Sequence, residues 1–145
     1  MASPPRTLVT GGTRGIGAAV ALRLARDGHE VTALGRRERP PVAPGVTMDR
    51  ADVMDPAALG AAFCRANADG QGLTGLVTSA GIWEPTPLSA DAVASAPAFR
   101  RVFDANVLGT IHAVAALLPH ARRGADVSVV LVGSTAGQRG ESGYS

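Results

Sequence analysis

The chain alternates short apolar runs with longer segments in which apolar residues recur at helical spacing. Continuous apolar runs are typical of strands in a sheet that is covered on both faces. A stripe of apolar residues at helical spacing is typical of a helix that packs against one face of such a sheet. The expected strands are residues 7–10, 31–34, 46–48, 73–78 and 127–132, and the expected helices are 15–26, 55–68 and 98–118. This alternation predicts one α/β domain over residues 1–145, a Rossmann-type doubly wound parallel sheet in strand order 3-2-1-4-5.

A glycine-rich turn connects the first expected strand to the first expected helix. Residues 8–17 read LVTGGTRGIG, which places glycines at positions 11, 12, 15 and 17. Glycines let the main chain approach a pyrophosphate, and the helix that follows presents unpaired N–H groups and the positive end of its dipole. The alternative is a glycine-rich turn without a ligand. A P-loop is excluded because the chain contains no lysine.

Composition narrows the class of protein. With 145 residues, 46% hydrophobic and 18% charged, the chain is expected to fold around a core. A net charge of +2 without an aromatic-rich basic run gives no support to nucleic-acid binding. No apolar run reaches about 18 residues and no signal-peptide core is present, so we expect a cytoplasmic protein that does not span a membrane. Cys64 is expected to be a buried helix residue, and the histidines lack metal-ligand spacing.

The end of the second expected strand indicates which dinucleotide would bind. A site that prefers NAD(H) usually has an acid about 20 residues beyond the glycines, bonded to the ribose 2′-OH. Gly35 stands in that place, and Arg36 follows it. A guanidinium can bind a 2′-phosphate, and Arg14 in the glycine turn adds a second positive charge. The sequence therefore predicts NADP(H) rather than NAD(H). The alternatives are a solvated basic loop, or a loop that turns Glu38 towards the ribose.

Several motifs in the same order resemble the short-chain dehydrogenase/reductase family along essentially the whole chain. They are T-G-x-x-x-G-x-G at residues 10–17, Asp52-Val53 after the third strand, and Ser79-Ala80-Gly81 after the fourth, where Thr78 departs from the family's Asn. The resemblance implies that Asp52 meets the adenine through its side chain and Val53 through its backbone. The implied cofactor-binding residues are Gly11, Thr13, Arg14, Gly15, Ile16, Gly17, Arg36, Asp52, Val53, Ser79, Ala80 and Gly81.

Two residues carry the expected catalytic roles. Asn106 falls on the apolar face of the long helix, where a buried amide needs partners, and Gly109 weakens that helix by about 1 kcal/mol. The resemblance implies that Asn106 supports a water in a proton relay, and the alternative is a satisfied core polar group. Ser134 ends the fifth strand. The resemblance implies that its hydroxyl bonds the substrate oxygen, and the alternative is a turn or cap residue.

The family's proton donor is a tyrosine with a lysine four residues later. The one tyrosine, Tyr144, comes ten residues after Ser134, whereas the family spacing is roughly 13, so Tyr144 is expected to be a loop residue. We therefore expect a fragment, incomplete at its C-terminus. The resemblance implies an oxidoreductase that moves hydride between nicotinamide and a small carbonyl compound or secondary alcohol, homo-oligomeric at full length. The alternative is a non-catalytic nucleotide-binding sensor or scaffold.

Overall fold

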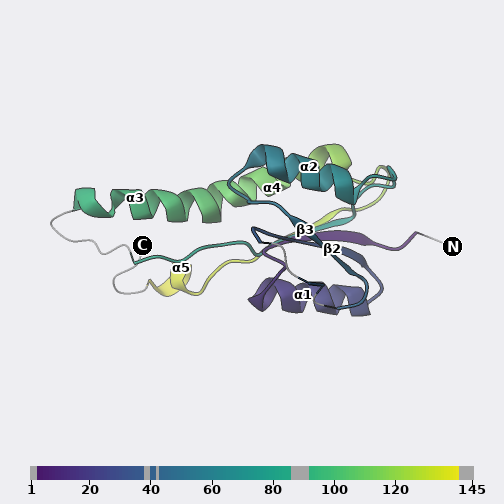
Figure 1. The fold of residues 1–145 in the computed structure, drawn as a ribbon, viewed down its shortest axis with the longest axis horizontal. Helices are drawn as coiled ribbons and strands as arrows, with labels where there is room; N and C mark the ends of the chain where they lie inside the picture. Colours follow the sequence, from purple (N-terminus) through teal and green to yellow (C-terminus); the bar gives the residue numbers. More distant parts are fainter. Residues whose placement is uncertain (1–2, 38–39, 42, 86–91, 141–145) are drawn as a thin grey trace.

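A computed structural model describes residues 3–37, 40–41, 43–85 and 92–140. Five parallel strands form one sheet in the order β3-β2-β1-β4-β5, which confirms the predicted order. The sheet lies between two helical layers (Figure 1). The strands are β1 (Arg6–Thr10), β2 (Glu30–Gly35), β3 (Val46–Arg50), β4 (Gly75–Thr78) and β5 (Ser128–Leu131). All five expected strands are therefore present, with ends that differ by one or two residues.

Helix α1 (Gly15–Arg26) covers one face of the sheet, and α2 (Pro56–Ala66) and α4 (Gly109–Leu117) cover the other (Figure 1). Helix α1 has the bounds that its apolar spacing predicts. Helix α2 begins after Asp55, whose carboxylate accepts hydrogen bonds from the N–H groups of Ala57 and Ala58, both at 3.0 Å. Pro56 then fills the first helical position, where no N–H is needed.

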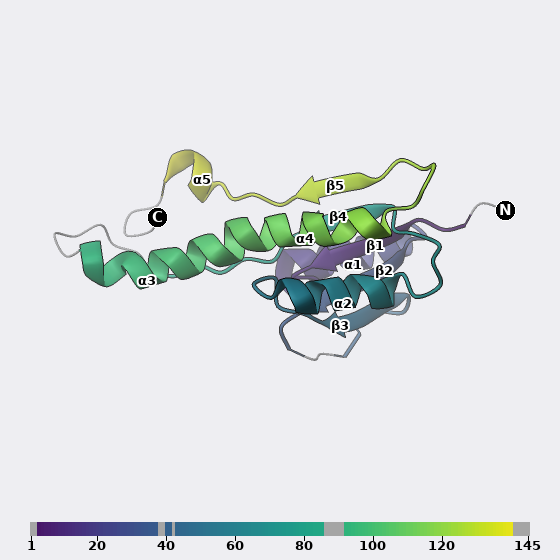
Figure 2. The same cartoon turned by 90° about the horizontal axis from the view of Figure 1, so that it is seen from above.

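The third expected helix is longer and less regular than its sequence indicates. It runs through α3 (Ala92–Phe103), the π-helical turn η1 (Asp104–Leu108), α4 and the 3₁₀ turn η2 (Leu118–His120). The expected start at Ala98 was wrong, because Pro97 lies inside α3. The proline removes one helical hydrogen bond, but the alanines around it favour helix. Helix α3 projects well past the sheet (Figure 2). A short helix, α5 (Ala136–Arg139), follows β5.

Alternate residues of the strands supply two separate cores. Leu8 packs in the cluster beneath α2 and α4, and its neighbour Val9 packs in the cluster beneath α1. Ile16, in the first turn of α1, is 66% exposed. The expectation that Cys64 is buried was wrong, because this residue is exposed on α2. Phe63, next to Cys64, is the buried member of that turn.

Two apolar surfaces are exposed in the described part of the chain. On β5, Val129, Val130 and Leu131 are all exposed. On the long helix, four exposed residues recur at a spacing of four and form what we call the helical stripe: Phe99, Phe103, Val107 and Ile111. Phe103 and Ile111 do not belong to the buried face of the long helix, because α4 turns Ala113 and Leu117 towards the core instead.

One described stretch, Ser95–His120, is long and apolar enough to cross a membrane by length and composition alone, although none of its uninterrupted apolar runs reaches about 18 residues. The core helix of a soluble protein passes the same test. Within this stretch α4 packs against α2 and β4, and its residues Ala113 and Leu117 are buried. This single stretch therefore does not indicate a membrane protein.

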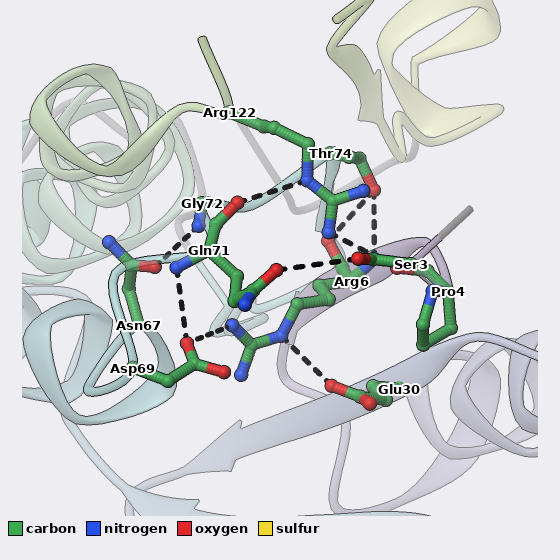
Figure 3. A network of polar contacts seen from close by, with 10 residues as sticks. All are labelled: Ser3, Pro4, Arg6, Glu30, Asn67, Asp69, Gln71, Gly72, Thr74 and Arg122. Carbon is green, nitrogen blue, oxygen red and sulfur yellow. Dashed lines mark hydrogen bonds and ion pairs between the residues drawn. The ribbon is translucent and has the colours of Figure 1, made fainter. Parts of the chain in front are cut away.

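A network of polar contacts lies at the end of the sheet where β1 begins (Figure 3). The Arg6 guanidinium is paired with Glu30 on β2 and with Asp69 in the turn before β4. Arg122 donates to the main-chain carbonyls of Gln71 at 3.0 Å and Pro4 at 3.2 Å. Hydrogen bonding from Arg6 holds the pKa of Asp69 below its usual value. Because these charges satisfy one another, the network fastens chain segments together.

Candidate cofactor site

The predicted cofactor residues converge on a cleft of about 380 Å³ at the carboxyl ends of the strands. Thr10 at the end of β1 is paired in register with Leu34 on β2 and with Thr78 on β4, so the loops that follow these strands emerge together. Eight of the twelve predicted residues line the cleft: Gly11, Thr13, Arg14, Arg36, Asp52, Val53, Ala80 and Gly81.

The four remaining residues, Gly15, Ile16, Gly17 and Ser79, adjoin the cleft in sequence without lining it. Ser79 donates its N–H to the carbonyl of Thr10 at 3.1 Å, which joins the loop after β4 to the end of β1.

The glycine turn leaves space that side chains would fill. Gly11 has a φ of +67°, and a Cβ built on it would stand 2.7 Å from the main-chain nitrogen of Ala80. A Cβ on Gly17 would overlap the carbonyl oxygen of Gly11. Arg14, the residue that precedes α1, makes no side-chain cap to the helix. The first turn of α1 therefore keeps the N–H groups that bind an anion, and the residues present fit a dinucleotide pyrophosphate.

Three arginines surround the place where a ribose-binding acid would stand. Arg14, Arg36 and Arg37 line the cleft together with Gly35, and among the described residues none of the three is in an ion pair. A Cβ on Gly35 would overlap the side chain of Thr13, so the backbone here has no room for a carboxylate side chain. The local charge is positive and accessible, which favours a ligand with an additional phosphate. Glu38 lies outside the described residues.

The loop after β3 is held against α4 at two points. Gly109 lets the helix approach Val53, since a Cβ there would stand 2.7 Å from the Val53 Cγ2. This packing explains a helix-weakening residue at that position. His112, one turn later, lies with its Nδ1 3.0 Å from the Val53 carbonyl oxygen. Within the loop, Asp52 Oδ1 accepts the N–H of Met54 at 3.0 Å. The sequence pattern gave no sign of the His112 contact.

Asn106 lies in η1, and its amide is fully engaged with the chain after β4. Its Oδ1 accepts the N–H of Ile82 at 2.8 Å, and its Nδ2 donates to the Ile82 carbonyl at 3.0 Å. The residue is exposed, so the expectation of a buried Asn was wrong, although its amide is paired as expected. Two residues further on, Glu84 accepts hydrogen bonds from Arg101 on α3, which lowers the pKa of that carboxyl.

Ser134 follows β5 and is exposed. Its Oγ accepts the N–H of Ala136 at 3.2 Å, as in a turn, and it is not among the residues that line the cleft. Tyr144 lies outside the described residues, and no cluster of three or more candidate metal ligands occurs within them.

Comparison with known proteins identifies the family. Residues 6–145 match the family described as short chain dehydrogenase. A putative ketoacyl reductase of the granaticin polyketide synthase from Streptomyces violaceoruber is 36% identical over 141 residues, covering 93% of this chain and 57% of that protein. The 3-oxoacyl-acyl-carrier-protein reductase MabA of Mycobacterium tuberculosis is 34% identical over 146 residues, covering 96% and 56%. The chain thus spans a little over half the length of these curated relatives.

Solved structures agree with the fold. A short-chain dehydrogenase/reductase from Serratia marcescens superposes with a TM-score of 0.80 at 28% identity, over 96% of this chain and 62% of the other. A variant of ElxO with NADPH bound superposes with a TM-score of 0.85 at 22% identity, over 98% and 60%, a likeness that concerns the fold alone. From its strand order, its glycine turn and the match over residues 6–145, this chain belongs to the short-chain dehydrogenase/reductase family.

Proposed function

We propose that the cleft binds NADP(H) and that the whole protein moves hydride between the nicotinamide and a carbonyl or secondary alcohol of a small molecule. The observation that carries the proposal is the charge of the cleft. Arg14, Arg36 and Arg37 line it beside the glycine turn, and Gly35 has no room for the acid that selects NAD(H). In the direction of reduction, the carbonyl carbon receives hydride, its oxygen receives a proton, and NADPH becomes NADP⁺.

The proposed binding roles follow from position. The main chain at Gly11 and the first turn of α1 bind the pyrophosphate, Arg36 binds the 2′-phosphate, and Asp52 and Val53 hold the adenine. The cofactor supplies the hydride, and the chain supplies binding and orientation. The complete set of proposed cofactor-binding residues is Gly11, Thr13, Arg14, Gly15, Ile16, Gly17, Arg36, Asp52, Val53, Ser79, Ala80 and Gly81.

For the chemistry, we infer that Ser134 donates its hydroxyl to the substrate oxygen and that Asn106 holds a water of the proton relay. Since both amide groups of Asn106 are used on Ile82, the water would bind its main-chain carbonyl. That carbonyl accepts a hydrogen bond from Thr110 Oγ1 at 3.0 Å. Two of the relatives are a putative ketoacyl reductase and a 3-oxoacyl-acyl-carrier-protein reductase, which supports a carbonyl substrate.

We further infer a cytoplasmic homo-oligomer that binds neither nucleic acid nor membrane. The helical stripe supports self-association, because apolar residues at this spacing on a projecting helix match a second helix. Size-exclusion chromatography with light scattering of the native gene product tests this. The wild type should be an oligomer, and the double substitution Phe103→Glu with Ile111→Glu should give a monomer.

The test of the function compares two dinucleotides. By isothermal titration calorimetry, NADPH should bind this chain at least about tenfold more tightly than NADH, as one charge-assisted contact to the 2′-phosphate provides. Equal affinities, or a preference for NADH, would contradict the NADP(H) assignment. The alternative is a nucleotide-binding module without catalysis. That candidate requires NADPH binding with no NADPH oxidation by the native gene product on ketone and ketoacyl thioester substrates.

A further inference from the structure

His112 and Val53 stand 59 positions apart in the chain and meet at the rim of the cleft. The half-buried His112 ring comes from α4, and its Nδ1 lies 3.0 Å from the Val53 carbonyl oxygen. A carbonyl oxygen only accepts hydrogen bonds, so Nδ1 is the protonated nitrogen in this contact. His112 itself does not line the cleft, whereas Val53 does.

The Val53 carbonyl belongs to the same rigid peptide unit as the N–H of Met54. That N–H donates to Asp52 Oδ1 at 3.0 Å. One peptide plane is therefore held at both ends, by the imidazole on its carbonyl side and by the carboxylate on its N–H side. Hydrogen bonds in such a chain polarise and strengthen one another.

Packing alone does not fix the orientation of this peptide. The contact between Gly109 and the Val53 side chain sets how closely the loop approaches α4. Van der Waals contact is not directional, so it does not fix the rotation of the Val53–Met54 peptide plane. The N–H of Asp55 bonds the carbonyl of Asp52 at 3.0 Å and so anchors the loop on its other side. Among the described contacts, only the His112 bond acts on the Val53 carbonyl.

We propose that His112 is a positioning residue that acts through the Val53–Met54 peptide to orient the Asp52 carboxylate towards the 6-amino group of a bound adenine. The proposal rests on the proposed function, in which the adenine lies at Asp52 and Val53. With the imidazole donor removed, the peptide can rotate, the Met54 N–H leaves the carboxylate, and Asp52 no longer selects adenine over a base that lacks the amino group.

The test measures base selectivity. Dissociation constants of the full chain are determined by calorimetry for NADPH and for its hypoxanthine analogue, in which oxygen replaces the 6-amino group. The wild type should prefer NADPH by about tenfold, the value of a hydrogen bond to a charged group. His112→Leu should reduce the preference to less than about threefold. His112→Asn should retain it, since the Asn amide nitrogen occupies the place of Nδ1 and still donates.

His29→Leu is the matched control. His29 Nδ1 makes a similar half-buried hydrogen bond, 2.9 Å from Thr7 Oγ1, at the opposite edge of the sheet. Its removal should lower the melting temperature and leave the base preference unchanged. Should His112→Leu not fold by circular dichroism, His112→Asp replaces it, because Asp has the shape of Asn without the donor.

The outcomes separate the two proposals. Failure of the wild type to bind either dinucleotide refutes the proposed function, and the role of His112 with it. NADPH binding without base preference in the wild type leaves the function standing and overturns the role of His112. The role is also overturned when the donor-less variant keeps the wild-type preference, or when His29→Leu loses the preference to the same extent.

Discussion

The side-chain amide of Asn106 brackets the main chain of Ile82, accepting its N–H at 2.8 Å and donating to its carbonyl at 3.0 Å. This pair joins the π-helical turn η1 to the segment that leaves β4 and lines the cleft. An amide is suited to the task because it offers a donor and an acceptor side by side. The helix irregularity therefore shapes the loop at the cofactor edge.

Loss of this bracket should loosen the segment after β4. Asn106→Ala removes both hydrogen bonds and should lower the free energy of unfolding by about 1–3 kcal/mol. The amide hydrogen of Ile82 should exchange faster with solvent. Thr110→Ala is the control, since it removes a hydroxyl bond to the Asn106 carbonyl and leaves Ile82 untouched. Unchanged exchange at Ile82 in Asn106→Ala would show that the bracket does not hold the segment.

Arg36 should determine the choice of cofactor. Arg36→Ala should weaken NADPH binding by about 10- to 100-fold, because it removes a charge-assisted contact to the 2′-phosphate, and should leave NADH binding unaffected. Arg26→Ala, on the last turn of α1 and outside the cleft, controls for net charge. Calorimetry of both variants at one ionic strength gives the comparison. An equal loss of NADPH affinity in the two variants would mean that Arg36 acts only through the net charge of the chain and not through contact with the 2′-phosphate.

A methyl group at position 17 should damage the glycine turn. Gly17→Ala forces a Cβ onto the carbonyl oxygen of Gly11, so it should destabilise the fold by about 1–3 kcal/mol and reduce NADPH affinity. Gly60→Ala on α2 is the matched control, with nothing within 4 Å of its added Cβ. That substitution should stabilise the chain by about 0.5–1 kcal/mol. Urea denaturation measures the free energy of unfolding of both variants. An unchanged free energy of unfolding in Gly17→Ala would contradict the close approach of position 17 to the Gly11 carbonyl.

Acid should weaken the network at the amino edge of the sheet. The pKa of Asp69 is lowered in the folded chain by hydrogen bonding from Arg6. The unfolded chain then binds the proton first, so the pair stabilises the fold above the unfolded pKa, and this stabilisation is lost as the pH falls through the folded pKa. The melting temperature of the wild type should fall more steeply on acidification than that of Asp69→Asn. Asp126→Asn is the control, and its melting temperature should change with pH as that of the wild type does. If the melting temperatures of Asp69→Asn and the wild type fell in parallel on acidification, the role of the Arg6–Asp69 pair would be contradicted.

Local patterns predicted the sheet because each strand and helix carries its own apolar periodicity. The bounds of α1 and the order of the strands follow from such patterns, and the glycine turn follows from backbone sterics. Contacts between distant segments have no local signal. The meeting of His112 with Val53, and the π turn that brings Asn106 to Ile82, depend on how α4 lies against neighbouring loops.

Local sequence patterns also could not show which apolar residues of α2 and of the long helix are buried. Cys64 and Phe63 are both apolar neighbours on α2, and only the packed helix decides which one faces the core. Phe103 and Ile111 similarly lie on a second apolar face, and apolar spacing alone does not tell this face from the buried one.

The π turn also sets the angular phase of the helical stripe. An α-helix advances by about 100° per residue, so four-residue steps drift by about 40°, and the three steps from Phe99 to Ile111 would accumulate about 120°. A π turn contains more residues per revolution, and η1 therefore recovers part of this drift. The stripe stays nearer to one line along the outer surface. Substitutions that gave all five residues of 104–108 α-helical geometry would rotate the outer surface of α3 relative to that of α4 and detach Asn106 from Ile82 in a single step.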